Sequence, residues 1–242
     1  MNGEKIRGAE IKTNNRFLRW LENYWYHYKW TTLIVAFFAI VAIICTMQMC
    51  THKKQDISIV YAGPKALNAE TADNLEGVMN FAMPEDFNRD GDKDTALVHY
   101  FLYSEEQIKQ IEAQTNADGQ SSGYVDKAYN SSSYDNFYSY MQTGESSVCL
   151  LDRSLFESLR DSGRLAKVSD TLGYLPEGAS DEYGVRLGDL DIYSSYGVMR
   201  ELPEDTVVCL LLPLIAGKSS DPEMYGYEKQ MFAAIIEYTS EK

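Results

Sequence analysis

The sequence lacks the motifs of several common catalytic and metal sites. It contains no Walker phosphate loop, no His-Glu-x-x-His and no Cys-x-x-Cys, and it has only three histidines. Those motifs build the phosphate cradle of NTPases and the usual zinc sites, so their absence removes the main evidence for such enzymes. We therefore expect a protein that is not an enzyme and that acts by binding or assembly.

Positive charge is scarce in most of the chain. From Asp56 onward, 14 Lys and Arg face 33 Asp and Glu, which gives a net charge of −19. Such a surface repels the phosphates of nucleic acids, so we expect no nucleic-acid partner.

Charge is missing altogether from Trp30 to Cys50, a run of 21 residues. At about 1.5 Å per residue a helix of this length spans roughly 30 Å, the thickness of the hydrocarbon core of a bilayer. The alternative, a buried core helix, rarely needs so long a run without charge. The run also lies too far from the N-terminus for a typical signal peptide, so we predict an uncleaved transmembrane helix.

The flanking charges predict the orientation of this helix. Two cations, Lys53 and Lys54, follow it, whereas six precede it: Lys5, Arg7, Lys12, Arg16, Arg19 and Lys29. Because positive flanks favour the cytoplasmic side, we predict a single-pass protein of the cell membrane with type II topology. The predicted parts are a cytoplasmic tail (1–29), the span (30–50), a connector (51–55) and an extracytoplasmic domain (56–242).

Aromatic residues crowd the stretch just before the span. Trp20, Tyr24 and Tyr28 recur at helical spacing. Rings with a polar tip suit the headgroup region of a membrane, which predicts a short helix at the inner surface. A docking site for a membrane-protein partner is the alternative.

The domain from Asp56 alternates strand and helix patterns. Apolar runs predict strands that begin at Ile57, Thr95, Val148 and Val207, and amphipathic spacing predicts helices between and after them. Ser104 with Gln107 forms a capping-box pattern, Asp152 precedes a helix, and Asp221-Pro222 starts the last helix. Because the strands are apolar throughout, we predict a single α/β domain with a mainly parallel sheet. His99, inside the run at Thr95, is expected in the core.

Ligands of open α/β sheets bind beyond the carboxyl ends of the strands. That rule selects Gly63, Ser104 and Asp152 as candidate ligand-binding residues, for a small ligand of unspecified chemistry.

One segment has the pattern of a calcium loop. Its oxygen-bearing residues match the first nine positions of an EF-hand, with Gly91 at the sharp turn: Asp86, Asn88, Asp90, Asp92 and Asp94. The twelfth position is Leu97 instead of a bidentate Glu, so any calcium bound here should be weakly held. An acidic turn that leads into a strand is the alternative.

Two further patterns leave alternatives open. Cys149 and Cys209 lie in apolar runs, as buried thiols do, although a disulfide between them would suit an oxidising compartment. Asn130-Ser131-Ser132 matches a glycosylation sequon.

A longer segment resembles a known family. Residues 134–173 read YDNFYSYMQTGESSVCLLDRSLFESLRDSGRLAKVSDTLG, with a helix at Tyr134, a glycine at Gly144, a strand that ends at Asp152 and a second helix after it. This order resembles a segment of bacterial extracellular solute-binding proteins, although Ser146-Ser147 replaces the usual Pro-Asp pair. The resemblance implies the fold of one lobe, without the second lobe of the clamp. A binding module is the first functional expectation, and an accessory subunit of a membrane complex is the alternative.

Overall fold

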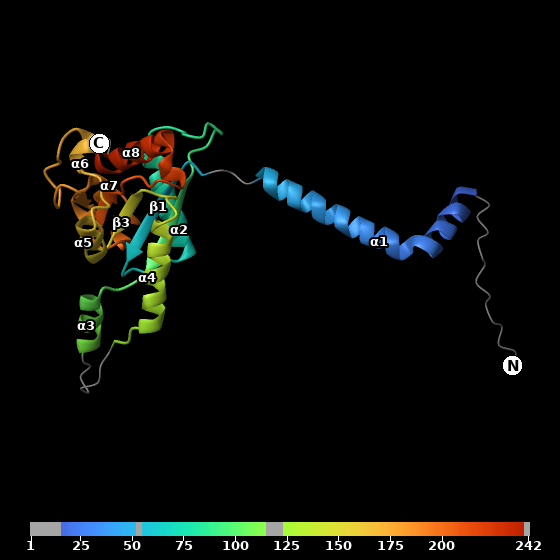
Figure 1. Ribbon diagram of the computed structural model, residues 1–242, viewed down its shortest axis with the longest axis horizontal. Coiled ribbons are helices and arrows are strands. Elements are labelled where there is room, and N and C mark those ends of the chain that lie inside the picture. Colours follow the sequence, from blue (N-terminus) through green and yellow to red (C-terminus); the bar gives the residue numbers. More distant parts are fainter. Residues whose placement is uncertain (1–15, 52–54, 115–122, 240–242) are drawn as a thin grey trace, which may run out of the picture. The chain divides into compact units, whose positions relative to one another are not determined.

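The computed structural model describes residues 16–51, 55–114 and 123–239. The chain forms two compact units, a long N-terminal helix and a domain that begins near residue 54 (Figure 1). Apart from three short 3-10 turns, the described elements are α1 (Arg16–Thr51), β1 (Ile57–Gly63), α2 (Ala69–Ala82), β2 (Thr95–Phe101), α3 (Glu105–Ala113), α4 (Lys127–Met141), β3 (Val148–Leu151), α5 (Arg153–Asp161), α6 (Val168–Leu172), β4 (Gly184–Arg186), α7 (Asp191–Ser195), β5 (Val207–Leu210) and α8 (Pro222–Ile236).

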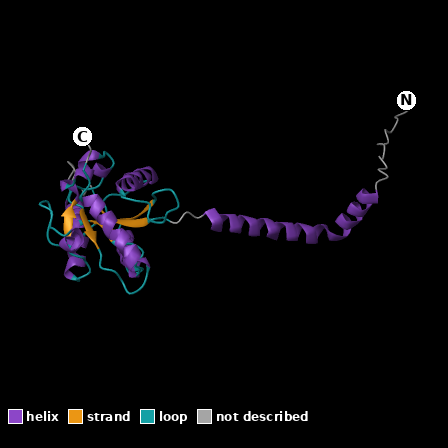
Figure 2. Ribbon diagram, turned by 90° about the horizontal axis from the view of Figure 1, so that it is seen from above, coloured by secondary structure: helices purple, strands orange, loops and turns teal. Residues whose placement is uncertain are grey.

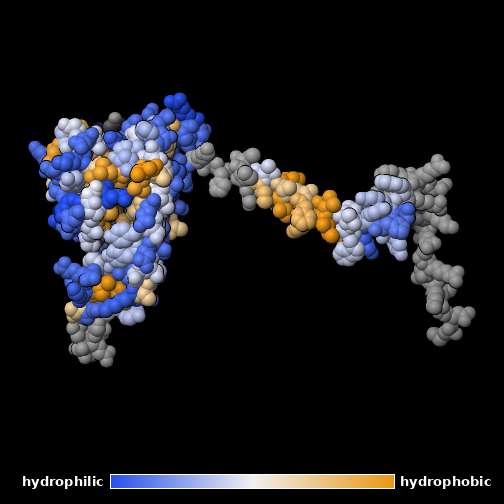
Figure 3. Space-filling view, viewed as in Figure 1, coloured by the Kyte–Doolittle hydropathy of each residue, from blue (hydrophilic) through white to orange (hydrophobic). Residues whose placement is uncertain are grey.

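Helix α1 contains the predicted span. Its part from Asn23 to Met47 is long and apolar enough to cross a membrane, as judged by length and composition. Figure 3 shows this apolar band beside a hydrophilic N-terminal part. The predicted aromatic stripe forms a ladder of rings, with centroids 5.6 Å apart for Trp20 and Tyr24 and 5.3 Å apart for Tyr24 and Tyr28. The predicted tail up to residue 15 and the connector at 52–54 lie outside the described residues.

The domain has the predicted α/β class, but its sheet is mixed. The strand order is β2-β1-β3-β5-β4. β1 pairs in parallel with β2 and β3, whereas β5 runs antiparallel to both β3 and β4. The prediction of a mainly parallel sheet was therefore wrong. Apolar character reports that a strand is covered on both faces, but it says nothing about the direction in which the strand runs.

Both faces of the sheet are covered, as Figure 2 shows. Alternate residues of each strand point to opposite sides. Ile57, Ile59 and Tyr61 belong to one core, together with residues of α2 and α8. Val60 and Ala62 belong to the other core, together with residues of α4 and α5. The result is three layers, helix on sheet on helix, which explains the continuous apolar runs.

Two local predictions were wrong for related reasons. β2 lies at the edge of the sheet, so His99 is exposed and does not lie in the core. The region from Leu165 to Leu202, where no strand was predicted, contains the other edge strand, β4. That strand has only three residues, Gly184 to Arg186.

The two domain cysteines lie directly opposite each other on β3 and β5. Cys149 and Cys209 are fully buried and carry free thiols, as the interpretation as small hydrophobic residues predicted. The contact with Cys209 and the burial raise the pKa of the Cys149 thiol, so it stays protonated.

One carboxylate is buried in the core of the domain. Glu228 on α8 is 3 % exposed, and its Oε1 accepts a 2.7 Å hydrogen bond from the backbone N–H of Ser147 at the start of β3. Its Oε2 has no hydrogen-bond partner. Burial raises the pKa of Glu228, while the hydrogen bonds from Ser147 and the charge of Lys218 oppose that shift.

The first prediction tests the core. Leu210 is fully buried in β5, between β3 and β4, so Leu210→Asp places an unpaired charge in the centre of the sheet. We expect a loss of several kcal/mol in the free energy of unfolding. Leu175→Asp, at a position that is 49 % exposed, is the matched control. Denaturant unfolding of both variants measures the difference, and equal midpoints would contradict the assignment of Leu210 to the core.

The second prediction concerns pH. A pKa raised by folding means that the folded state keeps a proton that the unfolded state has released, so stability from Glu228 is lost as pH rises above about 4.3 through the folded pKa. Glu228→Gln removes this loss and keeps an acceptor for Ser147. We expect the stability difference between variant and parent to grow in favour of the variant from acidic to neutral pH.

Glu228→Ala is the control for the hydrogen bond. It leaves the Ser147 N–H without its acceptor, which costs about 1–3 kcal/mol relative to Glu228→Gln at every pH. Parallel stability curves for the parent and Glu228→Gln would show that the carboxyl does not titrate with a raised pKa.

Candidate functional site

The three residues selected from strand ends, Gly63, Ser104 and Asp152, lie at the same end of the sheet. The Gly63 carbonyl accepts the N–H of Leu102, which joins the ends of β1 and β2. The N–H of Asp152 donates to the carbonyl of Ala62 at 2.8 Å, which joins the ends of β1 and β3. Ser104 lies just beyond β2 and caps α3.

A glutamine connects two of these residues. Ser104 and Gln107 form the predicted capping box, with Gln107 Oε1 accepting the Ser104 N–H at 2.8 Å. The Nε2 of the same side chain donates to Asp152 Oδ2 at 2.9 Å. Asp152, only 7 % exposed, also caps α5 by accepting the N–H of Ser154. The caps of two helices are thus joined through Gln107, whose bond to Asp152 no local pattern indicates.

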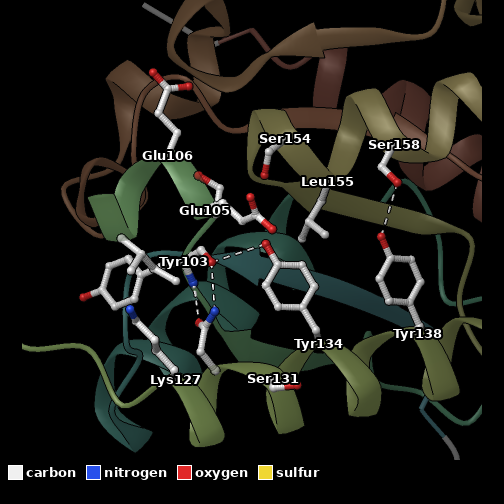
Figure 4. A pocket seen from close by; sticks show the side chains of 13 residues that line it. Tyr103, Glu105, Glu106, Lys127, Ser131, Tyr134, Tyr138, Ser154, Leu155 and Ser158 are labelled. Atoms are coloured by element: carbon white, nitrogen blue, oxygen red, sulfur yellow. Dashed lines mark hydrogen bonds between the residues drawn. The ribbon is translucent and has the colours of Figure 1, made fainter. Parts of the chain in front are cut away.

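Beside this network lies a groove of about 720 Å³ (Figure 4). It is formed by the start of α3, one face of α4 and the first turns of α5. Of the predicted residues only Ser104 lines it, whereas Gly63 and Asp152 are not among its lining residues. Its lining residues are Tyr103, Ser104, Glu105, Glu106, Ile108, Lys127, Asn130, Ser131, Tyr134, Tyr138, Ser154, Leu155 and Ser158.

The floor of the groove is held by the backbone of Tyr103. The Asn130 side chain accepts the Tyr103 N–H at 2.8 Å and donates to its carbonyl at 3.0 Å, as a neighbouring strand would. The Tyr134 hydroxyl donates to the same carbonyl at 3.3 Å. Asn130 is 8 % exposed, so its amide is committed to the fold. The match to a glycosylation sequon therefore marks a structural asparagine.

The groove is acidic. Glu105 and Glu106 lie on its rim and Asp152 behind its wall, whereas its one lysine, Lys127, pairs with Glu112 at 2.8 Å. Burial, and secondarily the charge of Asp152, raise the pKa of Tyr134, so its hydroxyl remains a donor at neutral pH. Tyrosine faces and hydroxyls beside carboxylates favour neutral polyhydroxylated or cationic ligands over anions.

The side chains that line the groove are mostly hydroxyls, carboxylates and aromatic rings. They include several serines but no histidine or cysteine. Ser154 Oγ donates to Asp152 Oδ1 at 2.6 Å, a bond that belongs to the helix cap. A Gly-x-Ser-x-Gly pattern occurs at 119–123, but residues 119–122 lie outside the described residues.

The acidic segment from Asp86 to Asp94 lies at the opposite end of the strands, just before β2. Asp86 accepts the N–H groups of Arg89 and Gly91, at 2.7 and 2.8 Å, and Asn88 accepts that of Asp90. These bonds stabilise the turn, in which Gly91 has a φ of +102°. Asp90 in turn accepts the N–H of Asp92.

Asp56 organises this turn from the start of β1. It is 2 % exposed and accepts the N–H groups of Asn88 and Asp94, at 2.7 and 2.9 Å. No local pattern indicates this role, because Asp56 lies thirty residues before Asp86. Within the described residues, no three His, Cys, Asp or Glu side chains are grouped so that they could hold a metal ion.

The chain matches no known protein-family model, no curated protein and no solved structure. The resemblance to solute-binding proteins therefore remains a prediction.

Calcium binding at residues 86–94 also remains a prediction. Each carboxylate has more lone pairs than the turn uses, so the segment could still bind the ion with water completing the shell. We expect a Kd on the order of 10⁻⁴ to 10⁻³ M, and about 1.4 kcal/mol of stabilisation at a tenfold excess of calcium over that value. A calcium titration at constant ionic strength should raise the Tm by a few degrees.

The variant Asp90→Ala should lose this response, whereas magnesium should leave the parent nearly unchanged. Asp90 is exposed, so its replacement leaves the core intact. A flat titration of the parent would identify the segment as an acidic turn only.

Proposed function

We propose that the chain is a membrane-anchored, extracytoplasmic binding module without catalytic activity, and that its ligand site is the groove between α3, α4 and α5. The groove carries the proposal: it lies at the carboxyl edge of the parallel strands and its volume of about 720 Å³ suits a small ligand. The Ser104–Gln107–Asp152 network joins the starts of α3 and α5, both of which line the groove, without any ligand. Preorganisation of this kind reduces the entropy cost of binding.

The orientation proposed for the anchor is N-terminus inside. Six cations before the apolar run against two after it support this topology. An acidic domain outside the cytoplasm also agrees with the resemblance of residues 134–173 to solute-binding proteins. There, helix α4, strand β3 and helix α5 follow one another in the order that the resemblance implies.

The fourth prediction tests the topology. Protease added to intact cells should remove a tag at the C-terminus and spare a tag at the N-terminus. The same digestion after detergent permeabilisation is the control. A protected C-terminal tag on intact cells would reverse the proposed orientation.

The fifth prediction tests the groove. A thermal-shift screen of the full chain in detergent, with neutral sugars, short peptides, polyamines and dicarboxylates, should give hits among the neutral or cationic compounds. Tyr134→Phe removes a lining hydroxyl, and should weaken a hit by about 1 kcal/mol, roughly fivefold in Kd. Tyr129→Phe, on the same helix outside the groove and 57 % exposed, should leave it unchanged.

Hits that respond equally to both variants would place the ligand elsewhere. Binding confined to dicarboxylates would contradict the charge argument.

The ring ladder on α1 favours a second candidate function, an accessory subunit of a membrane complex. Tyr24 contacts Trp20 and Tyr28 and accepts a hydrogen bond from Thr32 at 3.2 Å, so one face of the helix presents a continuous aromatic stripe. A photo-crosslinker at Tyr28 would capture one defined protein if this stripe is an interface. Crosslinks to lipid alone would favour the headgroup role.

A further inference from the structure

The segment after β5 exposes apolar side chains without a polar one among them. Residues 212–216 read Leu-Pro-Leu-Ile-Ala. Leu212 is 43 % exposed and Ile215 is fully exposed, at 103 %. Isolated apolar side chains on a surface are ordinary, but here four of five consecutive apolar residues are exposed and Leu214 is half-buried, a cluster typical of an interaction site.

This apolar loop is held in place by specific contacts. The Leu214 N–H donates to Ser219 Oγ at 3.2 Å, and the Ser219 N–H donates to the carbonyl of Gly144 at 2.9 Å. Gly217 has a φ of +88°, and a side chain there would collide with the carbonyl of Thr143. The fold therefore presents Leu212 and Ile215 on a supported turn.

The apolar loop lies at the end of the sheet at which β1 begins, where the chain enters the domain. The Leu211 N–H donates to the carbonyl of Ser147, just before β3. Val148, the residue after Ser147, pairs with Ile59 of β1. Leu211 therefore lies level with the first residues of β1. The two are separated by two strand spacings of about 4.8 Å each.

The connector from the candidate span enters the domain at this same end of the sheet. Only residues 52–55 separate Thr51, the last residue of α1, from Asp56. Fully extended, the chain between them reaches at most about 18 Å. A bilayer that holds α1 is therefore within reach of this edge, whereas a soluble partner would have to compete with it.

We propose that residues 212–216 insert into the interfacial region of the bilayer that holds α1. The domain would then contact the membrane directly, in addition to its covalent connection to the membrane-spanning helix. The inference rests on the proposed anchor. Apolar burial drives the contact, because the net charge of the domain, −19 from Asp56 onward, gives no attraction to anionic lipids. Lys218, the nearest cation in sequence, pairs with Glu145 at 3.3 Å.

Nitroxide accessibility in nanodiscs of phosphatidylcholine tests this contact on the full chain. In a Cys45→Ser/Cys50→Ser background, a spin label is attached at Ile215→Cys. The matched control is Tyr124→Cys, a residue 87 % exposed that precedes α4. Helix α4 ends at Met141, shortly before β3, so Tyr124 lies toward the opposite end of the domain. The buried thiols of Cys149 and Cys209 remain unlabelled under native conditions.

We expect the ratio of oxygen to nickel-chelate accessibility to be several-fold higher at position 215 than at position 124. Equal, water-like ratios at both positions would overturn the inference. So would low accessibility to both reagents at position 215, which would indicate a protein contact. A label on the native Cys45, with Cys50→Ser, separates the two proposals: if it also reports water, the anchor itself is wrong.

Discussion

The domain depends on the burial of one short strand, β3. Helices cover both of its faces, and a neighbouring strand pairs with each of its sides. The four residues of β3 are at most 1 % exposed, with β1 parallel on one side and β5 antiparallel on the other. Both ends of the strand are fixed by carboxylates. Glu228 binds the Ser147 N–H before it, and Asp152 caps the helix after it. Loss of β3 would separate the parallel half of the sheet from the antiparallel half.

This arrangement gives the two ends of the parallel strands different properties. The capping network and the groove lie at the carboxyl ends of β1, β2 and β3. The entry of the chain, the acidic turn organised by Asp56 and the supported apolar loop lie at the amino ends. Ligand binding and membrane contact are thus proposed at opposite ends of the strands, where neither has to disturb the other.

Local patterns in the sequence predicted most elements but not their arrangement. The capping box at Ser104, the caps at Asp152 and Asp221, and the strands at Ile57 and Val148 were confirmed, because each is fixed by neighbours in sequence. The direction of β5 and the edge position of β2 depend on how distant segments pair, which side-chain character does not encode. That is why the sheet was expected to be parallel and His99 to be buried.

The candidate site was predictable only in part for the same reason. The rule of strand ends selected Ser104, which lines the groove, and Asp152, which does not, whereas most lining residues come from other positions, several of them on α4. The sequence analysis used Tyr134 only to mark a helix, and Asn130 only as part of a sequon. Their shared contact with Tyr103 joins positions about thirty residues apart, so no local motif could reveal it. Asp56 and Glu228 were missed because nothing nearby in sequence distinguishes a buried carboxylate from a solvated one.

The pairing of β3 with β5 also has a consequence for how the domain folds. The partner of Leu151 is Val207, so a long stretch of chain must be in place before β3 is covered on that side. Closing so large a loop is entropically costly and slows folding. Until Val207–Leu210 arrives, an apolar strand has one open edge that invites pairing with other chains. A nascent chain that ends before residue 207 would contain every residue of the groove and still lack the strand that makes the sheet complete.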